Sequence, residues 1–262
     1  MADARALETF ARLVDVMARL RAPGGCPWDR EQTPESLRPY VLEEAYEVLD
    51  AIDRNDPGAL RDELGDLLLQ VVFHAELARE AGTFTIGDVA QAIADKLERR
   101  HPHVFGSVHV EGADDVVRNW KRIKAEERRA AGDEGMFVGV PKALPALARA
   151  QQLGERAAQH GLDWEDVRGA LEKVREELGE VEGALAAGDA DAAGRELGDL
   201  LLAVTSVARH LPVPAEMALR EATDRFVERA RWVEATAQAG GRPLEQLGPD
   251  EVDRLWQAAK AR

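Results

Sequence analysis

The amino-acid sequence predicts an all-α protein made of two helical modules in tandem. Apolar residues recur with the helical period of about 3.6 residues, as in the stripe formed by Leu7, Phe10, Val14 and Met17. Gly, Pro and Asn-Asp segments that stop helices interrupt this pattern repeatedly. No segment alternates apolar and polar residues for long enough to predict a strand.

Each expected helix lies between two such stops. Thr85 and Asp88 open one helix as a capping box, with Asp in place of the usual Glu. The stops are found at 55–58, 82, 101–102, 132, 161, 188–189 and 212–214. In the first half, helices are expected at 3–20, 38–54, 58–81, 86–100 and 113–131. In the second half, they are expected at 142–160, 166–187, 190–210, 214–239 and 249–260.

The two halves carry the same sequence units in the same order, which is most simply explained by duplication. Asp95–Arg100 resembles Asp224–Arg229, and a Trp-x-x-x-Lys unit ends each half. Between the halves, the stretch 129–142 is rich in Gly and small residues and is the natural linker. We therefore expect an N-terminal helical module at 1–130, a linker at 131–142 and a C-terminal helical module at 143–262.

Composition narrows the class of protein. The chain has 262 residues, of which 45% are hydrophobic, so a folded core is expected. Its formal net charge of −15 argues against nucleic acid as a partner. A single cysteine, Cys26, fits a reducing compartment. Neither a secretory signal nor an apolar run long enough to span a bilayer is found, so we expect a cytoplasmic protein without membrane contact.

A pattern of five carboxylates occurs twice, and each residue of the second copy lies 133 positions after its counterpart (176 − 43, 199 − 66). Carboxylates three residues apart share one helix face, so two antiparallel helices could direct four of them to one point. Such carboxylates repel one another unless a cation lies among them. Oxygen ligands suit Mg²⁺ or Mn²⁺, which often bridges to phosphates. The copies are Glu43, Glu44, Glu47, Glu63 and Asp66, and Glu176, Glu177, Glu180, Glu196 and Asp199.

The alternative is that these acids form solvated helix faces, which is the usual meaning of one Glu-Glu-x-x-Glu motif. The recurrence at one offset favours a metal site instead. So does the position of Glu63 and Glu196 inside very apolar helices, where unpaired acids are costly. Gly65 and Gly198 lower helix propensity in these segments and suggest that helices approach closely.

Basic and aromatic residues provide candidates for binding a nucleotide. Pairs of bases four residues apart on one helix are surface ion pairs by themselves, but beside a metal site they could hold phosphate oxygens. Each Trp-x-x-x-Lys unit could be a core or interface element, or could stack on a base and contact phosphate. The candidates are Lys96, Arg100, Trp120 and Lys124 in the first half, and Arg225, Arg229, Trp256 and Lys260 in the second.

The sequence contains no motifs that support other classes of enzyme. The sequence suggests no Ser/His/Asp or Cys/His arrangement and no Gly-rich phosphate loop. A di-iron bundle needs two Glu-x-x-His units, whereas Glu98-x-x-His101 occurs once and is followed by Pro102. The histidines at 101 and 103 are therefore expected in a turn at a helix end.

The repeated carboxylate motif resembles that of the MazG-like all-α nucleoside triphosphate pyrophosphohydrolases. The resemblance extends over almost the whole chain, in the two-domain form of the family. It is carried by the flanking blocks Gly25–Asp29, Leu37–Tyr40, Gly65–His74, Arg100–Phe105, Val140–Leu147 and Gly161–Trp164.

The resemblance implies Mg²⁺-dependent cleavage of nucleoside triphosphates between the α and β phosphates, which clears non-standard nucleotides. It also implies a homodimer, broad base tolerance and a C-terminal module that does most of the catalysis. The implied metal ligands are Glu177, Glu180, Glu196 and Asp199, with Glu44, Glu47, Glu63 and Asp66 in the first copy. The implied helper residues are Arg225, which replaces a lysine, Arg229, Trp256 and Lys260.

Chemistry adds a candidate for activating water. A carboxylate outside the tightest ligand set, Glu176 or Glu43, could orient or deprotonate the attacking water. The alternative to an enzyme is a metal- and nucleotide-binding sensor or dimerisation module with little turnover. The complete carboxylate set in both copies favours the enzyme.

Overall fold

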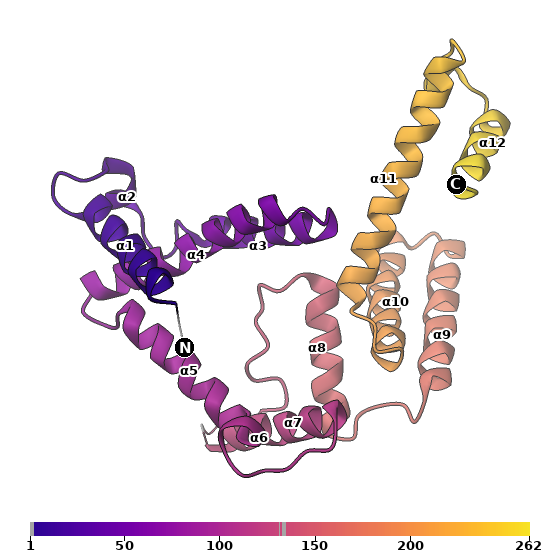
Figure 1. Cartoon of the computed structure of the whole chain (residues 1–262). Helices are drawn as coiled ribbons and strands as arrows, with labels where there is room; N and C mark the ends of the chain where they lie inside the picture. Colours follow the sequence, from indigo (N-terminus) through magenta and orange to yellow (C-terminus); the bar gives the residue numbers. More distant parts are fainter. Residues whose placement is uncertain (1–2, 131, 133–134) are drawn as a thin grey trace. The chain divides into compact units, whose positions relative to one another are not determined.

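The computed structural model describes residues 3–130, 132 and 135–262, so residues 131, 133 and 134 of the expected linker lie outside the described residues. The all-α prediction is confirmed, because every regular element in the described part of the chain is helical (Figure 1). The chain divides into two compact units, Met1–Glu127 and Arg128–Arg262. None of the described helices is long and apolar enough to cross a membrane.

In the first unit, the long helices α3 and α4 pack against each other, and α1 packs on α4. Helix α7 begins in this unit and ends just beyond its boundary. The helices are α1 (Ala4–Arg21), α2 (Pro27–Glu31), α3 (Arg38–Asp53), α4 (Pro57–Glu80), α5 (Ile86–Arg100), α6 (Pro102–Phe105) and α7 (Ala113–Ala130).

In the second unit, α9 and α10 form the most extensive helix pair, α8 packs on α10, and α12 runs back beside α11 (Figure 1). The elements are α8 (Ala146–Gln159), α9 (Val167–Ala186), α10 (Ala190–His210), α11 (Ala215–Ala239), the 3₁₀ helix η1 (Leu244–Gln246) and α12 (Pro249–Lys260).

Equivalent tight turns join the two central helix pairs. Between α3 and α4, Asn55 has a φ of 50°, and the Asp56 side chain then caps α4 by accepting two backbone N–H hydrogen bonds of 2.9 and 3.1 Å. Between α9 and α10, Gly188 has a φ of 71°, and Asp189 caps α10 with one such bond of 2.9 Å. Both turns reverse the chain, so the helices that carry the paired carboxylate motifs lie antiparallel.

Most helix positions agree with those expected from the sequence, and the departures have local causes. Helix α8 begins at Ala146 rather than 142, because Pro141 and Pro145 hold the intervening segment out of the helix. The short elements α2, α6 and η1 were not expected. Helix α5 ends at Arg100 with His101 as its C-cap, and Pro102 begins α6, so the histidine segment forms a helix end followed by one further turn.

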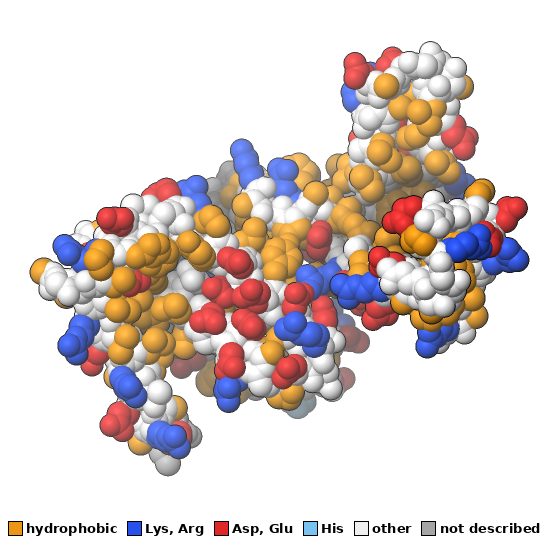
Figure 2. Space-filling model, turned by 90° about the horizontal axis from the view of Figure 1, so that it is seen from above, with side chains coloured by type: hydrophobic (Ala, Val, Ile, Leu, Met, Phe, Trp, Pro, Cys, Tyr) orange, Lys and Arg blue, Asp and Glu red, His pale blue; other side chains and the backbone are white. Residues whose placement is uncertain are grey.

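The large buried side chains are concentrated in the first unit. Met17, Leu37, Val72 and Phe73 form a cluster where α1, α4 and the start of α3 meet. Buried residues of the second unit are mostly small, as in Ala170 in the first turn of α9. Hydrophobic side chains also remain exposed, and Figure 2 shows some of them bordering a group of acidic side chains.

Removing the Leu37 side chain is expected to destabilise the first unit. Leu37 is 1% exposed, so Leu37→Ala leaves a cavity and should lower the free energy of unfolding by about 2–4 kcal/mol. The same change at Leu7, which is 61% exposed, should cost less than about 1 kcal/mol. Urea denaturation of both variants measures the difference. Equal effects would show that the Leu37 cluster is not a stabilising core.

Candidate metal and nucleotide sites

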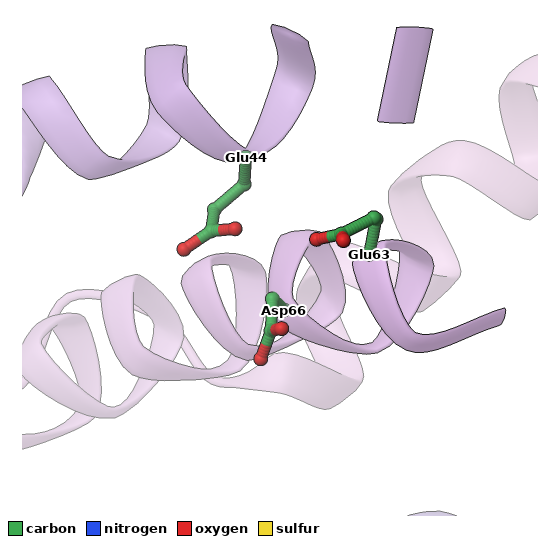
Figure 3. A group of neighbouring side chains, drawn as sticks. All are labelled: Glu44, Glu63 and Asp66. Carbon is green, nitrogen blue, oxygen red and sulfur yellow. The ribbon is translucent and has the colours of Figure 1, made fainter. Parts of the chain in front are cut away.

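The first carboxylate cluster lies between α3 and α4. Glu44 of α3 faces the helix that carries Glu63 and Asp66 (Figure 3). Each of the three side chains contributes one oxygen to a group in which all oxygens lie within 4.8 Å of one another. Glu43 is exposed on α3 and is not part of this group.

The second carboxylate cluster repeats this arrangement between α9 and α10. One oxygen each from Glu177, Glu196 and Asp199 lies within 4.8 Å of the other two. Glu177 is 4% exposed, and its Oε2 atom is buried without a hydrogen-bond partner. A buried, unpaired carboxylate oxygen is costly, and a bound cation would relieve the cost.

Glu47 and Glu180 lie beside these groups rather than within them. Desolvation, followed by the charges of Asp66 and Glu47, raises the pKa of Glu44. Desolvation and the charge of Glu47 also raise the pKa of Glu63. In the second cluster, the charge of Glu177 raises the pKa of Glu180, with a smaller contribution from Glu196. The carboxylates of each copy therefore repel one another across the helix pair.

The donor set fits a hard divalent cation. Three carboxylate oxygens converge in each cluster, and a fourth carboxylate is close enough to interact with them. In the second cluster, Glu177 Oε2 is also buried and unpaired. Mg²⁺ and Mn²⁺ are bound by such carboxylates together with water and substrate phosphates.

Sequence reasoning missed Lys173, which lies next to the second cluster. Its Nζ atom forms an ion pair of 2.9 Å with Glu176 Oε1 and a second ion pair with Glu177. Both acids raise the pKa of the lysine. The spacing of three and four residues on one helix could have revealed this contact.

In the first unit, one of the candidate nucleotide-binding residues, Arg100, is engaged by an internal carboxylate. Arg100 of α5 donates hydrogen bonds of 2.6 and 3.1 Å to Glu127 Oε2 on α7, which lowers the pKa of Glu127 to about 2. The Trp120 ring lies 5.9 Å from the Arg100 guanidinium and 4.1 Å from Lys124 Nζ. Lys96 is exposed on α5.

In the second unit, three of the four candidates line one pocket between α11 and α12. Arg225, Arg229 and Lys260 meet there in a cavity of about 450 Å³, together with Trp232, Ala259, Arg262 and one acid, Glu228. Trp256 packs instead against Phe226, with ring centroids 5.4 Å apart. Trp232, one turn after Arg229, is the tryptophan that lines this pocket and was not singled out from the sequence.

Comparison with known proteins identifies the family. The sequence model of the MazG nucleotide pyrophosphohydrolase domain matches residues 32–105 and again residues 166–234. The chain belongs to the MazG family. Both carboxylate clusters lie inside the matched stretches, as do Lys96, Arg100, Arg225 and Arg229, whereas the two Trp-x-x-x-Lys units lie outside them.

Similarity to individual MazG-family relatives extends over nearly the full length. The chain is 46% identical over 252 residues to a nucleoside triphosphate pyrophosphohydrolase of Escherichia coli, covering 95% of this chain and 96% of the relative. It is 44% identical to a nucleoside triphosphate pyrophosphohydrolase/pyrophosphatase MazG of Thermotoga maritima, covering 96% and 95%. A nucleoside triphosphate pyrophosphohydrolase of Mycobacterium tuberculosis is 37% identical over 90% of this chain and 63% of its own.

Proposed function

We propose that this protein is a nucleoside triphosphate pyrophosphohydrolase that converts NTPs and dNTPs to monophosphates and pyrophosphate with Mg²⁺, or Mn²⁺, as cofactor. The observation that carries the proposal is the pair of carboxylate clusters, each inside a MazG-family match. The names of the E. coli and T. maritima relatives support the same reaction. Its role would be to clear non-standard or excess nucleotides.

The residues that would hold the metal come from the central helix pairs. Glu177, Glu196 and Asp199 would bind it in the second unit, and Glu44, Glu63 and Asp66 in the first, with Glu180 and Glu47 completing each set. When bound, such an ion supplies Lewis-acid polarisation of phosphoryl oxygens and acidifies bound water.

The chain's own cations would hold the triphosphate. Arg225, Arg229 and Lys260 line one pocket and would stabilise the charge that develops on departing pyrophosphate. Trp232 lies on α11 and Trp256 lies on α12, and both are candidates to stack on the base. Glu176 in the second unit and Glu43 in the first would orient or deprotonate the attacking water.

The candidate phosphate-binding arginines of the two units differ in how tightly carboxylates hold them, and this difference supports a division of labour between the units. Arg100 is engaged by Glu127 at 2.6 Å, whereas Arg225 pairs with Glu221 at 3.7 Å, and both side chains of that pair are largely exposed. An exposed pair at that distance is weak and is easily exchanged for phosphate. We propose that the two units are the tandem modules and that the second carries out most of the turnover.

Exposed apolar stripes support a homodimer. Helices α4 and α10 each have exposed apolar residues at the same three positions, spaced four and three residues apart. Covering them requires a partner surface, and a second copy of the chain offers an identical one. The stripes are Leu64, Leu68 and Val71 on α4, and Leu197, Leu201 and Val204 on α10.

Light scattering at micromolar concentration is expected to give twice the mass of the chain. Leu201→Glu places a charge in the α10 stripe and should shift the protein toward monomer. Leu162→Glu is the matched control, because Leu162 is 68% exposed and lies between α8 and α9. A wild-type monomer with full activity would contradict the dimer.

We also propose a cytoplasmic protein without nucleic-acid partners, on the basis of its charge of −15 and its single cysteine.

The proposed reaction is tested by assaying pyrophosphate release from the four common NTPs and four dNTPs, with and without Mg²⁺. We expect Mg²⁺-dependent release of pyrophosphate from triphosphates of several different bases. Nucleotide binding without release from any of them would favour the sensor function instead.

A further inference from the structure

The two carboxylate clusters have different neighbouring residues at one equivalent position of their helices. In the second, Lys173 pairs with Glu176 and Glu177, which lie three and four residues further along α9. The corresponding residue of α3, 133 positions earlier, is Tyr40, whose ring packs edge-on against Trp28 with centroids 6.0 Å apart. An ammonium group therefore stands beside the second cluster at a place where the first has an aromatic ring.

The ion pair compensates Glu177 only in part. Lys173 contacts Oε1 of Glu177, while Oε2 of the same carboxylate is buried without a hydrogen-bond partner. Glu177 is 5% exposed in its side chain, whereas Lys173 is 34% exposed. The lysine can therefore turn toward solvent on its flexible stem while the carboxylate stays in place.

We propose that Lys173 is an internal cation that neutralises Glu177 in the metal-free protein, leaves it when a divalent ion binds the second cluster, and then contacts a phosphate oxygen of the substrate. The last step rests on the proposed function. A divalent ion competes for the same oxygens and repels the ammonium, but the backbone of α9 keeps the lysine within a turn of the cluster. A triphosphate offers it a new anionic partner there.

This role predicts two effects of opposite sign. Removing the ammonium eliminates a competitor, so the affinity of the second cluster for a divalent ion should rise. The same change removes a phosphate contact, so the affinity for triphosphate should fall. A purely structural lysine would not raise metal affinity when it is lost.

The first arm of the test is a Mn²⁺ titration of the full-length chain, followed by electron paramagnetic resonance, in an Asp66→Asn background that weakens the first cluster. Lys173→Met should bind Mn²⁺ about tenfold more tightly than the background protein, a change of about 1.4 kcal/mol. Arg175→Gln is the matched control, since it removes one positive charge from an exposed position on the same helix. Its effect should be less than about twofold. Equal or weaker Mn²⁺ binding by Lys173→Met would overturn the proposal.

The second arm measures binding of inorganic tripolyphosphate by calorimetry at saturating Mn²⁺. Lys173→Met should bind it several-fold more weakly than Arg175→Gln, and Lys173→Arg should recover much of the loss. Unchanged binding in Lys173→Met would remove the phosphate step. Neither arm requires turnover, so failure of the proposed hydrolysis would appear separately, in the pyrophosphate assay.

The wild-type protein gives an independent readout if Lys173 variants do not fold. Reductive ¹³C-methylation of lysines keeps the charge and labels each side chain for NMR. Saturating Mg²⁺ should shift the Lys173 resonance, because the ammonium leaves Glu177. A Lys173 resonance that stays in place while Mg²⁺ binds would overturn the proposal.

Discussion

Asp199→Asn is expected to reduce pyrophosphate release by roughly a hundredfold or more, because the neutral amide replaces a charged oxygen of the second cluster. Asp199 shares that cluster with Glu177 and Glu196, whose oxygens lie within 4.8 Å of its own. The variant should fold normally, since Asp199 is exposed and belongs to no core. Initial rates at several Mg²⁺ concentrations measure the loss, and excess Mg²⁺ should rescue part of it, because the defect lies in metal affinity.

Asp66→Asn is the matched control, because it makes the same change at the equivalent position of the first cluster. We expect it to leave a substantial part of the activity. The same comparison applies to Glu180→Gln and Glu47→Gln. Equal losses in both units would show two working sites, and a loss confined to the first would reverse the assignment.

Removal of divalent metal is expected to abolish pyrophosphate release. Without a cation, the carboxylates of each cluster repel one another; desolvation and this repulsion raise the pKa values of Glu44 and Glu63, and the charge of Glu177 raises that of Glu180. They would also repel an anionic triphosphate. Dialysis against EDTA should therefore eliminate activity, and Mg²⁺ or Mn²⁺ should restore it. Full activity in metal-depleted protein would exclude the clusters as the catalytic centre.

The fold and the carboxylate clusters could be predicted because both follow from local spacing. Residues three apart share a helix face, and the short turns at Asn55 and Gly188 make the neighbouring helices antiparallel. The convergence of Glu63 and Asp66 with Glu44 then needs only the register of one helix pair.

Contacts between distant segments could not be predicted in the same way. Arg100 was expected to be available for phosphate, but it pairs with Glu127, which lies 27 residues further along the chain on α7. Leu42 and Ile52 of α3 are apolar residues of a helix with a strongly apolar pattern, yet both are more than half exposed. Periodicity identifies an apolar face but does not tell which element covers it.

The pocket between α11 and α12 shows the same limit. The spacing of Arg225 and Arg229 on one helix was visible in the sequence, but their meeting with Lys260 depends on how α12 folds back. The same packing brings Trp232 into the pocket wall and places Trp256 against Phe226. No local pattern distinguishes these two tryptophans.

The central claim, that the two carboxylate clusters are divalent metal centres, is tested most directly by counting bound Mn²⁺ in the absence of nucleotide. Electron paramagnetic resonance of the wild type, of Asp66→Asn, of Asp199→Asn and of the double variant gives the number and affinity of sites. We predict two classes of site in the wild type, selective weakening of one class by each single substitution, and weakening of both in the double variant. Mn²⁺ binding that is the same in the wild type and the double variant would contradict the claim.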